Sequence, residues 1–391
     1  MKIPLPALLI LAGLLMATTR SSARTWTNAQ GRTFEAEFVR LNGAEVIFSL
    51  DGGKLFAMPL KDLSAADHSE LTITSAPHAS AGVPVAGNFG YPWPRDVRTT
   101  GPSACKVISE DPKAKRFIYE SAGYRFICDA RVTDDALRNF SVMFETTKAY
   151  AQALPLSLQS GHERGGKFEI LLFADPADYV RSGALPGSAG CFVPARGLVL
   201  VPMESLGLKK GGTGFSLDIK RKNTVLVYEL VHQLTPRAYF AAGAMGWFSE
   251  GLAEYMAATP YSWGYFAPDS RGIEVRKYAT GVGAETLPGR HLGAVIKAPR
   301  LRDFMLMGYG EFTGANANFN YGLGLLITHY FFHMEGGGKA SRITNFLKGL
   351  QAGQSGEAAL APLLGGSNFE RLESEITAAW ARNGVDIHFG Q

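Results

Sequence analysis

The sequence predicts a protein of the α+β class, in which a small all-β module precedes a larger domain of helices and strands. Short alternating runs separated by turn residues predict the β module before residue 67. Strand patterns between residues 116 and 202, followed by apolar helical patterns from residue 225 onward, predict the larger domain. Hydrophobic residues make up 46% of the chain and charged residues 19%, which is enough for two folded cores.

The first 23 residues have the pattern of a secretory signal peptide. Lys2 precedes an apolar stretch at residues 7–17, and Ser21, Ser22 and Ala23 supply the small side chains that a signal peptidase reads. This stretch is too short to span a membrane comfortably, and no later segment has the roughly 18 uninterrupted apolar residues of a spanning helix. We therefore expect a periplasmic or secreted mature chain without a membrane span.

The charge of the chain does not favour a nucleic-acid partner. The formal net charge of +4 includes Lys2 and Arg20, which would leave with the signal peptide. The other basic residues are scattered along the chain rather than gathered in one patch, so we expect no nucleic-acid binding.

Three cysteines are an odd number for an oxidising compartment, so they cannot all pair within the chain. Cys105 and Cys128 flank an expected pair of strands, and we expect a disulfide between them, with Cys191 unpaired. The alternative is three buried, reduced thiols, which behave as small hydrophobic side chains.

Residues 24–67 form the expected β module. Three runs alternate apolar and polar residues, at 33–41, 45–50 and 54–58. Asn42-Gly43 and Asp51-Gly52-Gly53 separate these runs, and such residues form the tight turns of hairpins. A small antiparallel barrel is therefore expected.

This module resembles the SLA homology domain, which is frequent in secreted bacterial proteins. The residues that carry the resemblance are Trp26, Thr27, Asn28, Gly31, Arg32, 34–38 and 58–64. The resemblance implies an SH3-like fold and, as in the endocytic adaptors where the domain was first described, binding of a short peptide. Without the resemblance, the exposed residues are those of any stable small barrel.

Residues 68–104 form the expected linker. Small residues and prolines dominate residues 75–84, which predicts an extended and mobile chain. Phe89, Tyr91 and Trp93 follow, although a free tether has no need of aromatic side chains. We expect this aromatic part to dock on the larger domain, at residues 105–391.

The apolar helical pattern at residues 225–234 contains polar residues that need an explanation. Tyr228 and His232 stand one helical turn apart and therefore share a face, next to Glu229. Burying Glu229 and His232 costs several kcal/mol unless each is paired or bound to a cation. An internal hydrogen-bonded Glu–His pair would satisfy this requirement without a metal.

A second apolar helical pattern, at residues 246–256, repeats the arrangement, because Glu250 and Glu254 stand one turn apart. Two such helices close together in the sequence favour a functional site over two separate structural pairs.

The two helices resemble those of the gluzincin metallopeptidases, most closely the bacterial peptidase MA-like domains, which carry H-E-x-x-H-Q and then W-x-x-E-G-x-A-E-Y. The matching residues are Glu229, His232, Gln233, Trp247, Glu250, Gly251, Ala253, Glu254 and Tyr255. The likeness covers roughly residues 115–385. It includes expected strands at 116–121, 124–128 and 168–173, a helix with Leu137, Phe140 and Phe144 on one face, and a hairpin of 190–194 with 198–202.

The resemblance implies a role for each residue of the site. Glu229 would polarise a metal-bound water, and Tyr321, at the start of a later helix, would face the oxyanion. His232 and Glu250 would hold zinc. The edge strand of the hairpin would pair with an extended peptide.

Tyr228 stands where the family has its first zinc-binding histidine. A tyrosine binds metal only as a phenolate, from a pKa of about 10, and its oxygen reaches farther from the backbone than an imidazole nitrogen does. Losing one ligand costs about 3 kcal/mol, or about a hundredfold in affinity. We therefore expect zinc to bind weakly or not at all, with Tyr228, His232 and Glu250 as its candidate ligands.

His329 and His333 also stand one helical turn apart, but no carboxylate lies between them. A core or supporting role is therefore expected for them. Amphipathic helices are expected after them, at residues 342–350 and 369–382.

Three functional hypotheses follow. The favoured one is an exported, catalytically impaired pseudo-peptidase that binds peptide or protein in its cleft. The second is an active zinc peptidase with Glu229 as the base, in which Tyr228 or another residue completes the coordination. The third is a non-enzymatic scaffold or adaptor, in which the β module is the functional part.

The signal-peptide assignment predicts that the exported chain begins at Arg24, because Ala23 is the last small residue of the expected cleavage site. Intact-mass spectrometry of exported protein checks this prediction, and a retained N-terminus would contradict it.

Overall fold

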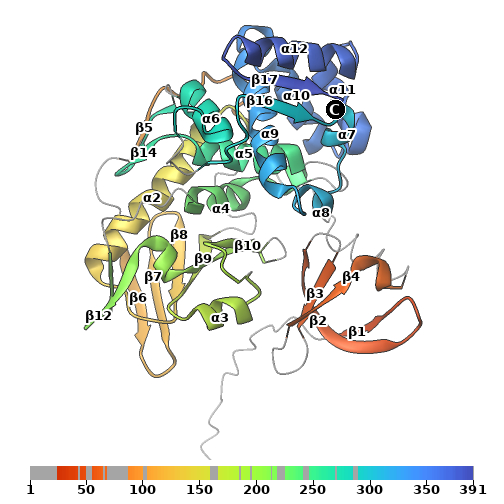
Figure 1. Ribbon diagram of the computed structural model, residues 1–391. Coiled ribbons are helices and arrows are strands. Elements are labelled where there is room, and N and C mark those ends of the chain that lie inside the picture. Colours follow the sequence, from red (N-terminus) through yellow and green to blue (C-terminus); the bar gives the residue numbers. More distant parts are fainter. Residues whose placement is uncertain are drawn as a thin grey trace, which may run out of the picture.

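The computed structural model describes most of the chain (Figure 1). The described residues are 24–42, 45–49, 55–64, 67, 87–99, 104–158, 166–184, 186–193, 196–212, 214–217, 225–240, 246–268, 271–284 and 289–390. The expected signal peptide and residues 75–84 of the expected linker lie outside the described residues. Helices and strands both occur throughout, so the predicted α+β class is confirmed.

The β module contains four antiparallel strands in the order β1-β2-β3-β4. They are β1 (Arg24–Thr27), β2 (Thr33–Asn42), β3 (Glu45–Ser49) and β4 (Leu55–Pro59). After η1 (Leu60–Asp62) the chain returns to the first strand, because Leu63 forms an antiparallel bridge with Asn28. Trp26 and Phe48 are buried in a separate core of this module, and the Trp26 indole N–H donates to the Ala36 carbonyl at 2.8 Å.

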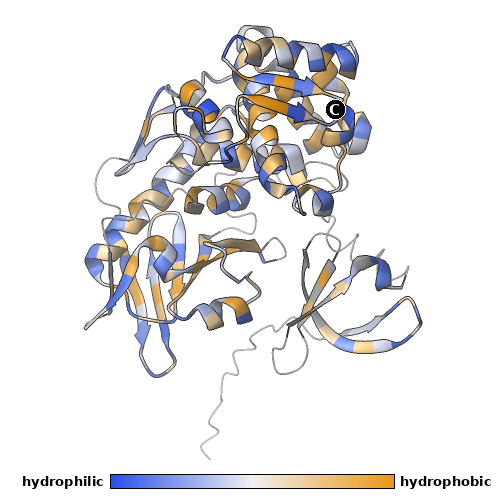
Figure 2. Cartoon of the chain, viewed as in Figure 1, coloured by the Kyte–Doolittle hydropathy of each residue, from blue (hydrophilic) through white to orange (hydrophobic). Residues whose placement is uncertain are grey.

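A six-stranded mixed sheet forms one half of the larger domain, in the order β10-β11-β9-β8-β7-β6. Its strands are β6 (Lys106–Asp111), β7 (Arg116–Glu120), β8 (Tyr124–Cys128), β9 (Phe168–Phe173), β10 (Cys191–Val193) and β11 (Leu198–Pro202). β9 runs parallel to both β8 and β11, and the other neighbours are antiparallel. β9 and β11 are rich in hydrophobic residues (Figure 2). The expected hairpin is confirmed, and among the strands that the structure describes its first strand, β10, forms one edge of the sheet.

The predicted disulfide between Cys105 and Cys128 is wrong, because all three cysteines are free thiols. Strand β7 lies between β6, which begins directly after Cys105, and β8, which ends at Cys128. Two strand spacings amount to about 9 to 10 Å, whereas a disulfide requires Cα atoms within about 7 Å. The sequence argument expected strands at 116–121 and 124–128 but not β6, so it did not show that Cys105 lies two strands away from Cys128.

Helix α2 (Asp134–Ala153) packs on this sheet through the apolar face that its sequence predicted. The rings of Phe140 and Phe144 each lie 5.0 Å from the ring of Phe126 on β8. Thr133 caps the N-terminus of the helix with its side chain, which accepts a backbone N–H of the first turn.

Helices α5 (Gly246–Ala257) and α9 (Ala317–His329) lie against each other in the other half of the domain (Figure 1). Every residue of α5 is buried. A Cβ atom on Gly251 would lie 2.6 Å from the Gly324 carbonyl oxygen, and one on Gly324 would lie 2.9 Å from the Trp247 carbonyl oxygen. Only glycine permits this approach, so the pair sets the distance between α5 and α9.

The other described helices are α3 (Pro176–Arg181), α4 (Val225–Leu234), α6 (Arg271–Thr280), α7 (Leu301–Met305), α8 (Tyr309–Phe312), α10 (Ser341–Gln351), α11 (Gly356–Leu364) and α12 (Phe369–Ala381). Shorter helical segments are η2 (Met203–Leu206), η3 (Arg237–Phe240), η5 (Tyr330–Met334) and η6 (Glu335–Gly337). Three small sheets complete the described strands. The first pairs β12 (Leu208–Gly211) with β13 (Gly214–Leu217), and the second places β15 (Tyr265–Phe266) between β14 (Tyr261–Ser262) and β5 (Val97–Arg98). The third pairs β16 (Val295–Ala298) with β17 (Asp386–Phe389). Within the described ranges, no helix is long and apolar enough to cross a membrane.

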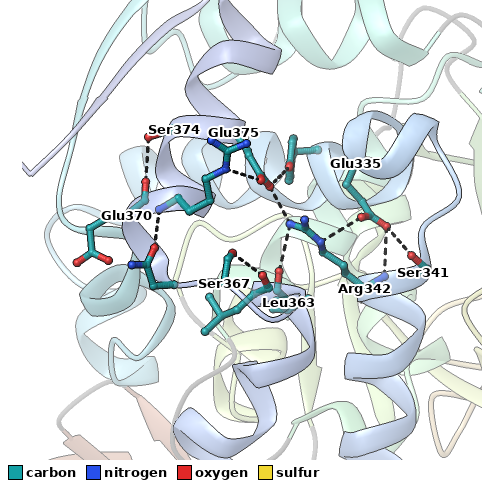
Figure 3. A network of polar contacts seen from close by, with 12 residues as sticks. Glu335, Ser341, Arg342, Leu363, Ser367, Glu370, Ser374 and Glu375 are labelled. Carbon is teal, nitrogen blue, oxygen red and sulfur yellow. Dashed lines mark hydrogen bonds and ion pairs between the residues drawn. The ribbon is translucent and has the colours of Figure 1, made fainter.

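An ion-pair network holds the C-terminal helices together (Figure 3). Arg342 of α10 donates to Glu375 of α12 at 2.9 Å, and its Nε lies 3.4 Å from Glu335. Arg371 and the Tyr330 hydroxyl also donate to Glu375, at 3.1 and 3.3 Å. Because Glu335 is only 3% exposed, its carboxylate requires the arginine beside it.

The aromatic end of the linker docks on the larger domain, as its composition predicted. The ring of Trp93 lies 4.4 Å from that of His333, 5.0 Å from Phe332 and 6.4 Å from Tyr255. The Tyr255 hydroxyl and His333 Nε2 form a hydrogen bond of 2.8 Å, and His329 is buried beside them. Both histidines therefore lie among core aromatic side chains.

Replacing Trp93 with alanine should lower the free energy of unfolding by about 2 kcal/mol, because the half-buried indole contacts three rings of the domain. Tyr91→Ala is the matched control: Tyr91 is 66% exposed, and its loss should change stability by less than about 0.5 kcal/mol. Urea unfolding of the full chain measures both. Equal effects of the two substitutions would show that the linker does not dock.

Candidate functional site

Helices α4 and α5 bring together the polar residues of the two apolar helical patterns. The buried apolar residues of α4 are Leu226, Val227, Leu230, Val231 and Leu234. Tyr228 and Glu229 are half-buried, and His232 is 7% exposed. On α5, Glu250 and Glu254 are 1% and 0% exposed. Both carboxylates therefore need partners inside the protein.

Three side chains surround the carboxylate of Glu250. Tyr228 of α4 donates a hydrogen bond to Oε2, and the Tyr309 hydroxyl of α8 donates to Oε1 at 2.9 Å. His232 Nε2 lies 3.4 Å from Oε2. The Tyr309 residue as a whole is 54% exposed, so its ring faces outward while its hydroxyl points at Glu250. We call these four residues the Glu250 cluster.

The Glu250 cluster favours an ionised pair. Burial by itself raises the pKa of Glu250, but the charge and hydrogen bond of His232 and the two tyrosine hydroxyls outweigh burial and lower it below its usual 4.5. Burial by itself lowers the pKa of His232, but the Glu250 carboxylate outweighs burial and raises it above 6.5. A protonated His232 therefore balances the charge of Glu250 in the interior.

Tyr228 lies at the centre of the cluster as a neutral phenol. Burial, followed by the neighbouring charge of Glu250, raises its pKa well above 10. Its ring lies 4.9 Å from His232 and 6.3 Å from Tyr321 of α9. A phenol that donates its proton to Glu250 has no phenolate lone pair for a metal.

The side chains of the Glu250 cluster meet only some of the geometric and chemical requirements of a zinc site. Two ligands at about 2.0 to 2.1 Å from zinc, at a tetrahedral angle, lie about 3.3 Å from each other, close to the 3.4 Å between His232 and Glu250. The third position holds the phenol of Tyr228. Among the described residues, no three histidine, cysteine, aspartate or glutamate side chains form a group that could hold a metal ion. The residues present therefore do not fit a three-ligand zinc site.

Glu229 lies beside the Glu250 cluster and contacts the sheet. Its Oε2 accepts the backbone N–H of Phe192, on edge strand β10, at 2.9 Å. Burial raises the pKa of Glu229 above 4.5, and His232 and the Phe192 N–H offset this only in part. The predicted base therefore contacts the strand that is expected to receive a peptide.

Glu254 forms a separate buried ion pair one turn further along α5. Arg290 donates to both of its oxygens, with Nε at 3.2 Å from Oε2. The guanidinium also lies over the ring of Tyr321, 4.8 Å from its centre. Tyr321 is thus held between Arg290 and Tyr228. Burial, followed by the charge of Glu250, raises the pKa of Tyr321, so it is a neutral phenol as well.

The structure brings all five predicted site residues into one region, because Tyr228, His232 and Glu250 touch, and Glu229 and Tyr321 lie beside them. Sequence reasoning missed Tyr309 and Arg290. Two buried carboxylates on α5 do imply hydrogen-bond donors, but nothing in the sequence indicates which of the 14 tyrosines would supply one.

Comparisons of the chain with known protein families and with curated proteins found no match. The interpretation of the site therefore depends on the geometry above and on the motifs that the chain carries.

The buried pair predicts a pH dependence of stability. The raised pKa of His232 gives stabilisation that is complete below pH 6.5 and is lost as the pH rises through the folded-state value. The lowered pKa of Glu250 gives stabilisation that is present above pH 4.5 and is lost as the pH falls through the folded-state value. His232→Asn should therefore cost more unfolding free energy at about pH 6 than at about pH 8.5.

Urea unfolding at the two pH values measures this difference. His388→Asn, at an exposed position of β17, controls for the loss of an imidazole and should cost the same at both. A loss of unfolding free energy in His232→Asn that is larger at the higher pH would contradict the presence of an ion pair between His232 and Glu250.

Proposed function

We propose that residues 105–391 form a gluzincin-like domain that no longer hydrolyses peptides but binds an extended segment of peptide or protein. The observation that carries this proposal is the Glu250 cluster. Zinc needs the lone pairs of Glu250 and His232, and in this chain two tyrosine hydroxyls and the imidazole are directed at that carboxylate. A buried, satisfied cluster of this kind gives a stable domain without a metal.

The edge strand β10 supports the binding part of the proposal. An edge strand has backbone groups that are not paired within its sheet, and an extended peptide can add to it as a further strand. Phe192 of this strand and Phe240 are half-buried, with ring centres 6.4 Å apart, and each ring lies within 6.3 Å of the His232 ring. These rings offer an apolar surface to a side chain of the peptide.

We further propose that residues 24–67 form an SH3-like module that binds a second peptide or protein, and that the protein acts outside the inner membrane. The strand order, together with the bridge from Leu63 to Asn28 beside β1, supports an SH3-like arrangement. The buried Trp26 and Phe48, 4.8 Å apart, give this small module a core of its own.

A zinc peptidase is the second candidate, because the separation of His232 and Glu250 is close to that of two zinc ligands. In that case Tyr228 would have to lose its proton to become the third ligand, which burial opposes.

Replacing Tyr228 with histidine should create a three-ligand site and raise zinc affinity by about a hundredfold, from about 3 kcal/mol per ligand. The parent protein should purify with well under one zinc per chain. Tyr309→Phe, added to Tyr228→His, should raise zinc affinity further, because it removes a donor that competes for Glu250. Elemental analysis and competition with a chelating dye measure both quantities.

Stoichiometric zinc in the parent protein, lost in both His232→Ala and Tyr228→Phe, would overturn the pseudo-peptidase proposal in favour of an unusual enzyme. Tyr91→Phe, at an exposed tyrosine of the linker, controls for the loss of a hydroxyl and should leave zinc content unchanged.

A further inference from the structure

The backbone N–H and C=O groups of Phe192 point away from the other strands of its sheet. In a β-strand the N–H and C=O of one residue point to the same side, and alternate residues point to opposite sides. The Phe192 N–H is directed at Glu229 of α4 rather than at β11. Phe192 is the middle residue of the three in β10, so its N–H and C=O form the outward pair of this edge.

The carboxylate of Glu229 stands where the carbonyl oxygen of an adjoining strand would be. The distance from Phe192 N to Glu229 Oε2 is 2.9 Å, which is the usual N···O distance of a hydrogen bond in a β-sheet. One oxygen atom at this position excludes another. A peptide that adds to β10 must therefore replace the carboxylate with its own carbonyl group.

Gly190, directly before β10, makes room for this contact. A Cβ atom at Gly190 would lie 2.8 Å from Glu229 Cγ, closer than real Cβ atoms approach other heavy atoms. Any other residue at position 190 would push the Glu229 side chain away from the strand. Because Gly190 has no side chain, the Glu229 carboxylate can reach the Phe192 N–H.

We propose that Glu229 is an internal cap on the β10 edge, which an extended peptide displaces by placing a backbone carbonyl on the Phe192 N–H. The inference rests on the proposed peptide-binding function and adds its regulation: Glu229 lowers the affinity for every peptide strand. A hydrogen bond to a charged group is stronger than one to a neutral amide, so only peptides with further contacts overcome the cap.

Binding of one probe to the full chain and its variants tests the cap. The probe is a fluorescein-labelled, end-blocked peptide of alternating threonine and valine, followed by fluorescence anisotropy. Glu229→Ala should bind it roughly tenfold more tightly than the parent, because the competing charged hydrogen bond is gone. Glu229→Gln should fall between the two, because its amide oxygen still accepts the N–H but carries no charge.

Gly190→Ala tests the same cap without changing Glu229, and it should tighten binding as Glu229→Ala does. Glu169→Ala is the matched control: this exposed carboxylate lies on β9, two strands away from β10, and its loss should leave affinity unchanged. The probe with every backbone nitrogen methylated should bind none of the variants, because it has no N–H to donate to the Phe192 carbonyl and its methyl groups prevent a strand from approaching β10 closely.

The outcomes separate the cap from the function on which it rests. Binding of the probe with equal affinity by the parent, Glu229→Ala and Gly190→Ala would overturn the cap and leave peptide binding intact. Tighter binding by Glu229→Ala that persists with the methylated probe would also overturn it, because the peptide would then not pair with β10. Absence of binding by every variant would overturn both proposals.

Discussion

The buried carboxylate of Glu250 is the constraint on which the arrangement of this site depends. At 1% exposure it has no contact with bulk water, and an unpaired charge there would cost more than a domain of this size can tolerate. Two tyrosine hydroxyls and one imidazole meet this requirement, and they come from α4 and α8. The carboxylate therefore fixes the positions of both helices relative to α5.

Close helix packing and a second ion pair extend this arrangement. Gly251 and Gly324 let α5 and α9 approach closely, and Tyr321 comes from α9 to lie beside Tyr228. Arg290 neutralises Glu254 and covers the ring of Tyr321. Each buried acid on α5 thus has its own cation, from His232 or Arg290. The charges of Glu250 and Glu254 are therefore balanced by side chains of the chain itself.

Much of this arrangement could be predicted from the sequence, because it depends on periodicity. The apolar pattern of α4 and the one-turn spacing of Tyr228 and His232 placed both side chains on one face, and Glu250 was assigned to the same site from its motif. The hairpin of β10 and β11 was expected from the resemblance to the gluzincin metallopeptidases. Contacts between distant segments could not be predicted. Tyr309 lies 59 residues from Glu250, and β6, which places Cys105 two strands away from Cys128, was not expected from the sequence.

The central claim is that Glu250 is held by neutral phenols and a protonated imidazole instead of a metal ion. The most direct measurement is the near-ultraviolet absorbance of tyrosinate while zinc is titrated into the parent protein at neutral pH. The account predicts no tyrosinate signal, because Tyr228 keeps its proton and donates a hydrogen bond to the Glu250 carboxylate. A tyrosinate signal that grows in step with one equivalent of zinc and disappears in Tyr228→Phe would contradict it.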